Sequence, residues 1–372
     1  MGTTPVTAPC SITGTTRSLP GVPDLPAGLG DLPLTVESYE LERLEKPVSS
    51  AFTRVTTVVR LQGGGEEGIG EDVTYDADDQ QALQDAGPGQ PLAGAHTLGT
   101  FADLAGSLDL FATPPAFESY RAYRRWAFES AALDLALRQA GRTLAETLGR
   151  EPRPVRFVVS LRLGEPATAE PVLRRLELYP WMQFKLDPTS SWTDELVATL
   201  VATGAVESVD LKGRYSGTAV DQPPDAELYR RVAEGFPEAL IEDPALTPET
   251  EPVLAPHWHR ITWDEPIHSV ADLESLPVSP HSVNIKPSRI GSLSALLDTY
   301  DYCGAHGIRP YGGGQFELGP GRGQIQYLAS LFHPSAPNDI APGPYNEPEP
   351  RAGLPVSPLA PAPSATGFRW DT

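Results

Sequence analysis

Positive charge is scarce in this chain of 372 residues. It has 28 lysines and arginines against 49 aspartates and glutamates, so its formal net charge is -21 at pH 7. Such a surface repels phosphate backbones and anionic membranes. We therefore expect neither nucleic acid nor a membrane as a partner. An anionic small molecule can still bind such a protein where a metal ion and lysines reverse the local field.

Cysteines and long apolar runs are also few. Only Cys10 and Cys303 occur, so no disulfide framework is expected. No apolar stretch approaches the roughly 18 residues that a membrane-spanning helix needs. The first residues lack the basic segment and apolar run of a signal peptide, which favours a cytoplasmic location. The hydrophobic fraction is 40%, enough for two domains or for one large barrel with additions.

The first half of the chain has the pattern of a small α+β domain. Residues 1–33 are rich in Thr, Pro and Gly without periodicity, and predict an irregular arm. Residues 34–150 open with alternating apolar and polar positions, which predict strands. They include a helical pattern at 120–149 with a face of apolar and small residues, and Gly141 is its expected end.

Residues 151–337 have a different sequence pattern. Short apolar runs alternate with helical patterns, and repeated βα units imply parallel strands with helices outside. Seven or eight units favour an α/β fold of the TIM-barrel kind over an open sheet. The segment is short beside the roughly 250 residues of a full barrel, so its turns must be tight. The Pro-rich residues 338–372 are expected to pack back on the cap or barrel.

Acidic residues stand at the predicted ends of three successive strands. They are Asp210 in AVESVDLKG, Glu242 in EALIEDPA and Asp264 in HRITWDEPI. The carboxyl ends of parallel barrel strands meet at one mouth, where three carboxylates repel one another unless a cation neutralises them. All-oxygen ligands select a hard ion, so the sequence predicts a Mg²⁺ site, with Mn²⁺ as the second choice.

Two lysines flank these acids along the chain, Lys185 in WMQFKLDP and Lys286 in HSVNIKPS. A cation that holds a substrate carboxylate makes the proton on the adjacent carbon removable. A lysine that is buried beside a cation has a lowered pKa and can act as the base. Each residue alone is more often a turn former, a helix cap or a solvated charge. Five of them on separate strands point to a proton-transfer site.

In these motifs the chain resembles the enolase superfamily, and within it the muconate-lactonizing subgroup. GIGEDVTY is similar to the Gly-x-Gly-Glu turn of the family's capping domain. VDLKG, IEDP and WDEP resemble the family's three metal-ligand motifs, and FKLD and NIKPSRIG have Lys185 and Lys286 where the family has its catalytic lysines. GGGQFELGPGR is similar to a segment of o-succinylbenzoate synthases and N-acylamino-acid racemases.

The resemblance implies an α+β capping domain over a modified TIM barrel of the (βα)7β type. It implies Mg²⁺-dependent removal of the proton next to a carboxylate through an enediolate, with a small-molecule carboxylate as the substrate. The nearest reactions are those of o-succinylbenzoate synthase and N-acylamino-acid racemase. A muconate-type cycloisomerase, an acid-sugar dehydratase and a non-catalytic binding or scaffold protein remain alternatives. The analogy extends to symmetric homo-oligomers.

The chain departs from the family pattern at three places. Gln183 replaces the first lysine of a Lys-x-Lys pair, Lys212 replaces the amide of an Asp-x-Asn pair, and no Asp-x-Asp follows Gly314. Strand alternation would point Lys212 the same way as Asp210. Lys212 then supplies the charge that Gln183 lacks, or binds a second anionic group of the substrate, or only pairs with Glu242 or a loop acid.

The remaining candidates are assigned more weakly. Glu265 is expected to make contacts behind the metal ligands, and Arg289 is expected to have a structural role. Cap loops near 34–51 and 76–91 are expected to choose the substrate. The candidate substrate-binding residues are Lys212, Asn284, Gln315 and Glu317.

Overall fold

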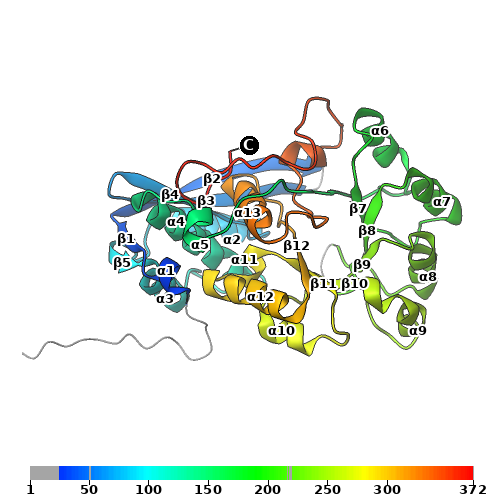
Figure 1. The fold of residues 1–372 in the computed structure, drawn as a ribbon, viewed down its shortest axis with the longest axis horizontal. Helices are drawn as coiled ribbons and strands as arrows, with labels where there is room; N and C mark the ends of the chain where they lie inside the picture. Colours follow the sequence, from blue (N-terminus) through cyan, green and yellow to red (C-terminus); the bar gives the residue numbers. More distant parts are fainter. Residues whose placement is uncertain (1–24, 50–51, 216, 218–219, 372) are drawn as a thin grey trace, which may run out of the picture.

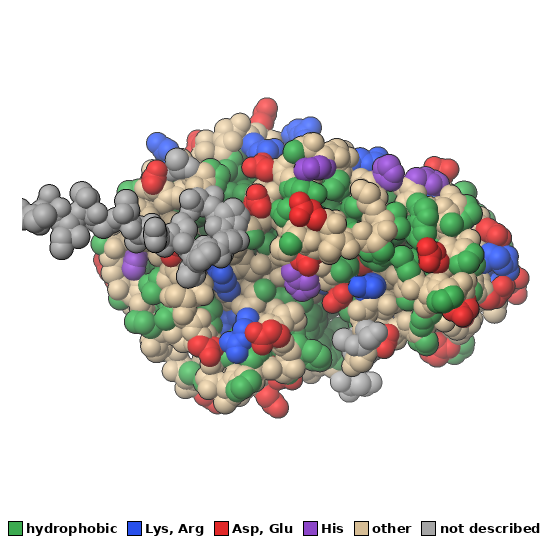
Figure 2. All heavy atoms as spheres, turned by 90° about the horizontal axis from the view of Figure 1, so that it is seen from below, with side chains coloured by type: hydrophobic (Ala, Val, Ile, Leu, Met, Phe, Trp, Pro, Cys, Tyr) green, Lys and Arg blue, Asp and Glu red, His purple; other side chains and the backbone are tan. Residues whose placement is uncertain are grey.

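The computed structural model describes residues 25–371 apart from 50–51, 216 and 218–219. It combines an antiparallel capping domain with a sheet of seven parallel strands (Figure 1). The predicted α/β fold, an α+β cap on a barrel, is confirmed. Acidic side chains are spread over the face that Figure 2 shows, as the negative net charge requires. Within the described ranges, every helix is too short or too polar to span a bilayer.

The cap is a three-stranded antiparallel sheet against one long helix. Glycines allow the close approach: a Cβ added at Gly68 or Gly70 would lie 2.2 Å or 2.1 Å from a carbonyl oxygen of the helix. The helical pattern at 120–149 divides at Gly141, which has a left-handed φ of 63°. The sheet order is β2 (Ser38–Ser49), β3 (Phe52–Gly63) and β4 (Glu66–Asp72), and the helices are α4 (Tyr120–Gln139) and α5 (Leu144–Leu148).

Two predictions about the cap were wrong in detail. The predicted irregular arm ends in a short helix and a strand, while residues 1–24 lie outside the described part of the chain. The predicted loop at 76–91 is mostly helix, because Asp76 caps it by accepting from the backbone of Asp78 and Asp79. The elements concerned are α1 (Ala27–Gly30), β1 (Pro33–Val36), α2 (Ala77–Ala86), β5 (Gly94–Thr97), which pairs with β1, and α3 (Leu98–Ser107).

The second domain alternates strands and helices from residue 159 onward. Its strands pair in parallel and in chain order, so their carboxyl ends share one edge. The strands are β6 (Val159–Leu161), β7 (Phe184–Leu186), β8 (Val206–Asp210), β9 (Leu240–Glu242), β10 (Ile261–Trp263), β11 (Ser282–Ile285) and β12 (Arg309–Gly312). The helices are α6 (Glu170–Leu178), α7 (Asp194–Thr203), α8 (Ala226–Gly235), α9 (Glu251–Leu254), η1 (Ala255–Arg260), α10 (Val270–Ser275), α11 (Pro287–Ile290), α12 (Leu293–His306), α13 (Pro320–Phe332) and η2 (Gly343–Asn346).

A two-residue bridge joins the edges of the seven-stranded sheet. Asn338 forms a parallel bridge with Phe157, just before β6, and Asp339 forms one with Gly313, just after β12. Asn338 O accepts from Val158 N at 2.8 Å, and Asp339 N donates to Gly312 O at 2.8 Å. This short eighth segment completes the (βα)7β arrangement.

The cap is tied to the barrel, and the C-terminal segment packs on the cap. Buried Glu71 of β4 accepts from three backbone N–H groups at the start of α13, from Leu318, Gly319 and Gly321, at 2.7 to 3.1 Å. Phe368, fully buried near the end of the chain, packs its ring edge against Trp126 of α4. Arg54 of β3 also donates to the backbone oxygens of Gln315 and Phe316, so the cap contacts the loop between β12 and α13 at both of its ends.

Candidate active site

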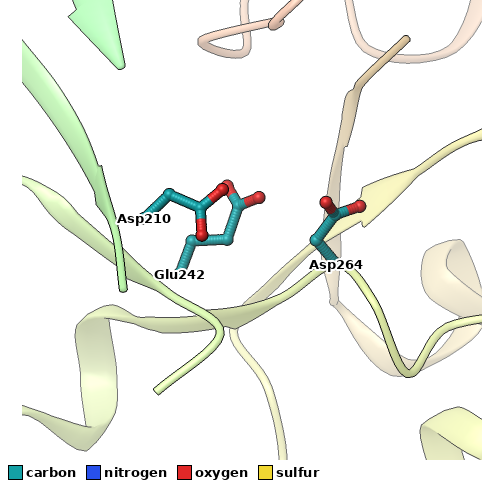
Figure 3. A group of neighbouring side chains, drawn as sticks. All are labelled: Asp210, Glu242 and Asp264. Atoms are coloured by element: carbon teal, nitrogen blue, oxygen red, sulfur yellow. The ribbon is translucent and has the colours of Figure 1, made fainter. Parts of the chain in front are cut away.

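Three carboxylates converge where neighbouring barrel strands end. Asp210 is the last residue of β8, Glu242 is the last residue of β9, and Asp264 follows β10 directly. One oxygen from each lies within 4.8 Å of the others, and all three side chains are fully buried. In Figure 3 the carboxyl groups of Asp210 and Glu242 lie together, and that of Asp264 faces them from the far side.

The two flanking lysines point inward to this triad. Lys185 lies on β7, and its Nζ is 2.9 Å from Asp210 Oδ2 and 2.5 Å from Glu242 Oε1. Lys286 directly follows β11, and its Nζ is 2.7 Å from Asp264 Oδ2. Because the strand order places the three acids between β7 and β11, the ammonium groups lie on opposite flanks of the triad.

The charges of the site shift its pKa values in opposite directions. Burial raises the pKa of Glu242 to about 8, against the attraction of Lys185. For Asp210 the effect of burial is outweighed by Lys185 and Lys212, and its pKa falls to about 2. Burial lowers the pKa of Lys286, whereas the acids around Lys185 overcome burial and hold its pKa well above the usual range.

This donor set suits a divalent cation. Three buried carboxylates supply only hard oxygen ligands, which Mg²⁺ and Mn²⁺ prefer. Oxygens that share one Mg²⁺ lie about 3 to 4.2 Å apart, and the three carboxylate oxygens lie within 4.8 Å of one another, so the cluster has the size of a site for a single ion. A cation there would also lower the raised pKa of Glu242.

Two tyrosines that contact the triad escaped the sequence analysis, and Arg289 was named there without its contact to an acid of the triad. Arg289, expected to be structural, forms a direct ion pair with Asp264, which also accepts from Tyr215 OH at 2.8 Å. Tyr311 OH donates to Glu242 Oε2 at 2.7 Å. In the sequence these residues are notable only because they lie near strand ends. Nothing in the local sequence shows which carboxylate each of them contacts.

Asp243, which the sequence analysis did not single out, contacts the turn behind the candidate metal ligands, the region where Glu265 was expected to act. Asp243 accepts from the backbone N–H groups of Asp264 and Glu265, both at 2.8 Å, and so fixes the turn after β10. The side chain of Glu265 makes no hydrogen bond or ion pair to the described residues, and its charge partly opposes the lowering of the pKa of His268 by burial.

The weaker candidates divide into two groups. Lys212 and Asn284 reach the triad: Lys212 pairs with Asp210, and Asn284 Nδ2 lies 3.4 Å from Glu242 Oε1. Gln315 and Glu317 lie on the loop after β12 and contact other groups. Gln315 Nε2 donates to Tyr123 OH of the cap at 2.9 Å, and Glu317 pairs with Arg322 at 3.0 Å.

The prediction that strand alternation directs Lys212 was wrong, because β8 ends at Asp210. Lys212 lies in the following turn, with a left-handed φ of 53°. That turn bends the chain back, so the backbone N–H of Lys212 donates to Asp210 Oδ1 at 3.2 Å and its ammonium contacts Oδ2. Lys212 therefore points toward Asp210 as predicted, but because of the turn and not because of strand alternation.

A barrel domain with three buried acids on successive strand ends, below an antiparallel cap, defines a member of the enolase superfamily in its muconate-lactonizing subgroup. Two family models match the chain: the Domain of unknown function (DUF8230) C-terminal domain at residues 151–347 and its N-terminal domain at residues 27–147. The chain belongs to the DUF8230 family.

Curated relatives carry names from the same superfamily. The o-succinylbenzoate synthase of Bacillus subtilis (strain 168) is 27% identical over 246 residues, 61% of this chain. The match spans 62% of that protein, less than two thirds of its length. The N-succinylamino acid racemase of an Amycolatopsis species is 28% identical over 332 residues, 83% of this chain and 86% of the relative.

Solved structures share the fold. An enolase-superfamily protein from Listeria innocua Clip11262 superposes with a TM-score of 0.62 at 19% identity, over 83% of this chain and 86% of that one. The muconate cycloisomerase from Pseudomonas fluorescens gives a TM-score of 0.62 at 19% identity, over 91% and 94%. At this identity the likeness supports the architecture alone.

Proposed function

We propose that the protein is a Mg²⁺-dependent enzyme that removes the proton next to a substrate carboxylate, with a reaction of the o-succinylbenzoate synthase or N-acylamino-acid racemase type. The observation that carries this proposal is the buried triad with an ammonium group on each flank. A cluster of ion pairs with only a structural role does not need three acids on successive strand ends opposite two lysines. Proton transfer beside a cation needs acids that hold the cation and a group that carries the proton.

Asp210, Glu242 and Asp264 would hold the cation. When bound, it supplies positive charge that makes the proton on the carbon next to a carboxylate more acidic. The protein's own contribution is to exclude water and to fix the ligands. Tyr311 restrains Glu242, and Arg289 with Tyr215 restrains Asp264, so each carboxylate keeps its direction.

Lys185 and Lys286 would move the proton. They approach the triad from β7 and β11, so each would reach one face of a substrate carbon held between them. One lysine takes the proton from its face as a neutral amine, and the other faces the opposite side as an ammonium group. In a racemase the second lysine returns a proton, and in a dehydration it assists the leaving group.

Deuterium exchange tests this proposal without knowledge of the true substrate. A panel of N-succinyl and N-acetyl amino acids is incubated with enzyme and Mg²⁺ in D₂O, and loss of the α-proton signal is followed by NMR. We expect exchange with at least one carboxylate, its loss with EDTA, and loss of exchange for one enantiomer in each of Lys185→Ala and Lys286→Ala. A metal-bound protein that exchanges none of the panel contradicts the proposal.

A further inference from the structure

Lysine is rare in this chain, and its distribution is uneven. The sequence has four lysines, the other basic residues being arginines, and three of the four are Lys185, Lys212 and Lys286. The fourth, Lys46, lies on β2 and pairs with Glu347 at 3.3 Å. A compact ammonium group differs from a guanidinium in size, hydration and mobility. Lys212 is the site lysine to which the proposed proton transfer gives no task.

Lys212 occupies a position that a cation would need. Its ammonium contacts Asp210 Oδ2, the same oxygen that lies 2.9 Å from Lys185 Nζ. Both hydrogen-bonding directions of that oxygen are therefore used by ammonium groups. A divalent ion bonded to Asp210 would meet the charge of Lys212 only a few ångströms away, where like charges repel strongly in a buried site.

A second acid lies within reach of the same ammonium group. Asp187, two residues after Lys185, has its Oδ1 4.0 Å from Lys212 Nζ. That oxygen is buried and accepts no hydrogen bond from the described residues. A small rotation of the flexible lysine chain would close the gap, and the ring of Tyr215, 5.0 Å from Nζ, borders the same space. Lys212 therefore contacts Asp210 and has Asp187 nearby as a second possible partner.

We infer that Lys212 is an internal counter-ion that competes with the divalent cation for Asp210 and moves to Asp187 when the cation binds. The inference rests on the metal site of the proposed function. It assigns to Lys212 a role that weakens metal binding and keeps Asp210 neutralised while the metal is absent, and it assigns to Asp187 the role of taking up the ammonium group when the metal binds. Neither residue need touch the reacting carbon.

Metal affinity without substrate tests the competition. Mn²⁺ binding is measured by electron paramagnetic resonance of the free ion for wild type, Lys212→Met and Lys212→Gln, with Lys46→Met as the matched control. We expect both Lys212 variants to bind Mn²⁺ at least tenfold more tightly than wild type, and Lys46→Met to match wild type. Wild-type affinity in both folded Lys212 variants overturns the inference and leaves the proposed function standing. A wild type that binds no Mn²⁺ overturns both.

A double-mutant cycle tests the transfer to Asp187. Removal of the Asp187 charge weakens metal binding through simple electrostatics in any background, but transfer requires Lys212 to be present. We expect Asp187→Asn to weaken Mn²⁺ binding at least fivefold more in the wild-type background than in Lys212→Met. An equal effect in the two backgrounds overturns the transfer.

Discussion

His333 makes the stability of the barrel depend on pH. It directly follows α13 and is 5% exposed. Its Nδ1–H donates to Asn338 Oδ1 at 2.6 Å, and Tyr300 OH, 3.1 Å from Nε2, donates to the other ring nitrogen. Asn338 belongs to the bridge that joins the edges of the sheet. These contacts suit the neutral imidazole of His333. A protonated ring would have an N–H at Nε2, which could no longer accept from Tyr300 OH.

The magnitude follows from the shift in pKa. Burial lowers the pKa of His333 from 6.5 to about 4, partly opposed by the hydrogen bond with Asn338. A pKa that is lowered in the folded state gives a contribution that is complete above pH 6.5 and is lost as the pH falls toward 4. Between pH 8 and pH 5 the loss in free energy of unfolding is about 2 kcal/mol.

Urea unfolding at pH 8 and pH 5 measures this contribution. The comparison uses wild type and His333→Gln, with EDTA present so that the acids of the metal site titrate equally in both. We expect the stability difference between them to change by about 2 kcal/mol over this range, in favour of the variant at low pH. His306→Gln, an exposed change on α12, serves as the control. A difference between wild type and His333→Gln that is the same at both pH values would refute the reasoning.

Three further predictions concern the site and its supports. In Gly313→Ala the new Cβ would lie 2.4 Å from Asn284 Oδ1 and 2.7 Å from Lys286 Cε, so we expect about 100-fold slower exchange with metal affinity retained. Glu71→Gln should cost about 2 kcal/mol in urea unfolding, because buried N–H groups lose a charged acceptor. Asp264→Asn should abolish Mn²⁺ binding and cost about 3 kcal/mol, because two buried cations lose their partner.

Each of these variants has a control or a contrary outcome. Gly304→Ala places its Cβ in open space and should leave exchange unchanged. Exposed Glu40→Gln should change stability by less than about 0.5 kcal/mol, and a similar value for Glu71→Gln would show that the loop does not depend on it. Retained Mn²⁺ affinity in Asp264→Asn would remove that residue from the ligand set.

The sequence by itself determined the order of the βα units and the strand-end positions of Asp210, Glu242 and Asp264. These features are local, because a short apolar run followed by an acid and a turn predicts a strand end whatever lies beside it. Parallel strands then bring such ends to one edge. The strands of the α+β domain at 34–150 and the long helix before Gly141 followed from periodicity in the same way.

Only the tertiary structure decided which side chains meet. Arg289 reaches Asp264 from the following unit, and Asn338 and Asp339 join the edges of the sheet well after β12 has ended at Gly312. Lys212 contacts Asp210 because its backbone is left-handed, a conformation that a lysine in the sequence does not predict. Pairings between distant segments depend on packing and on loop dihedral angles, and the pattern of a single segment contains neither.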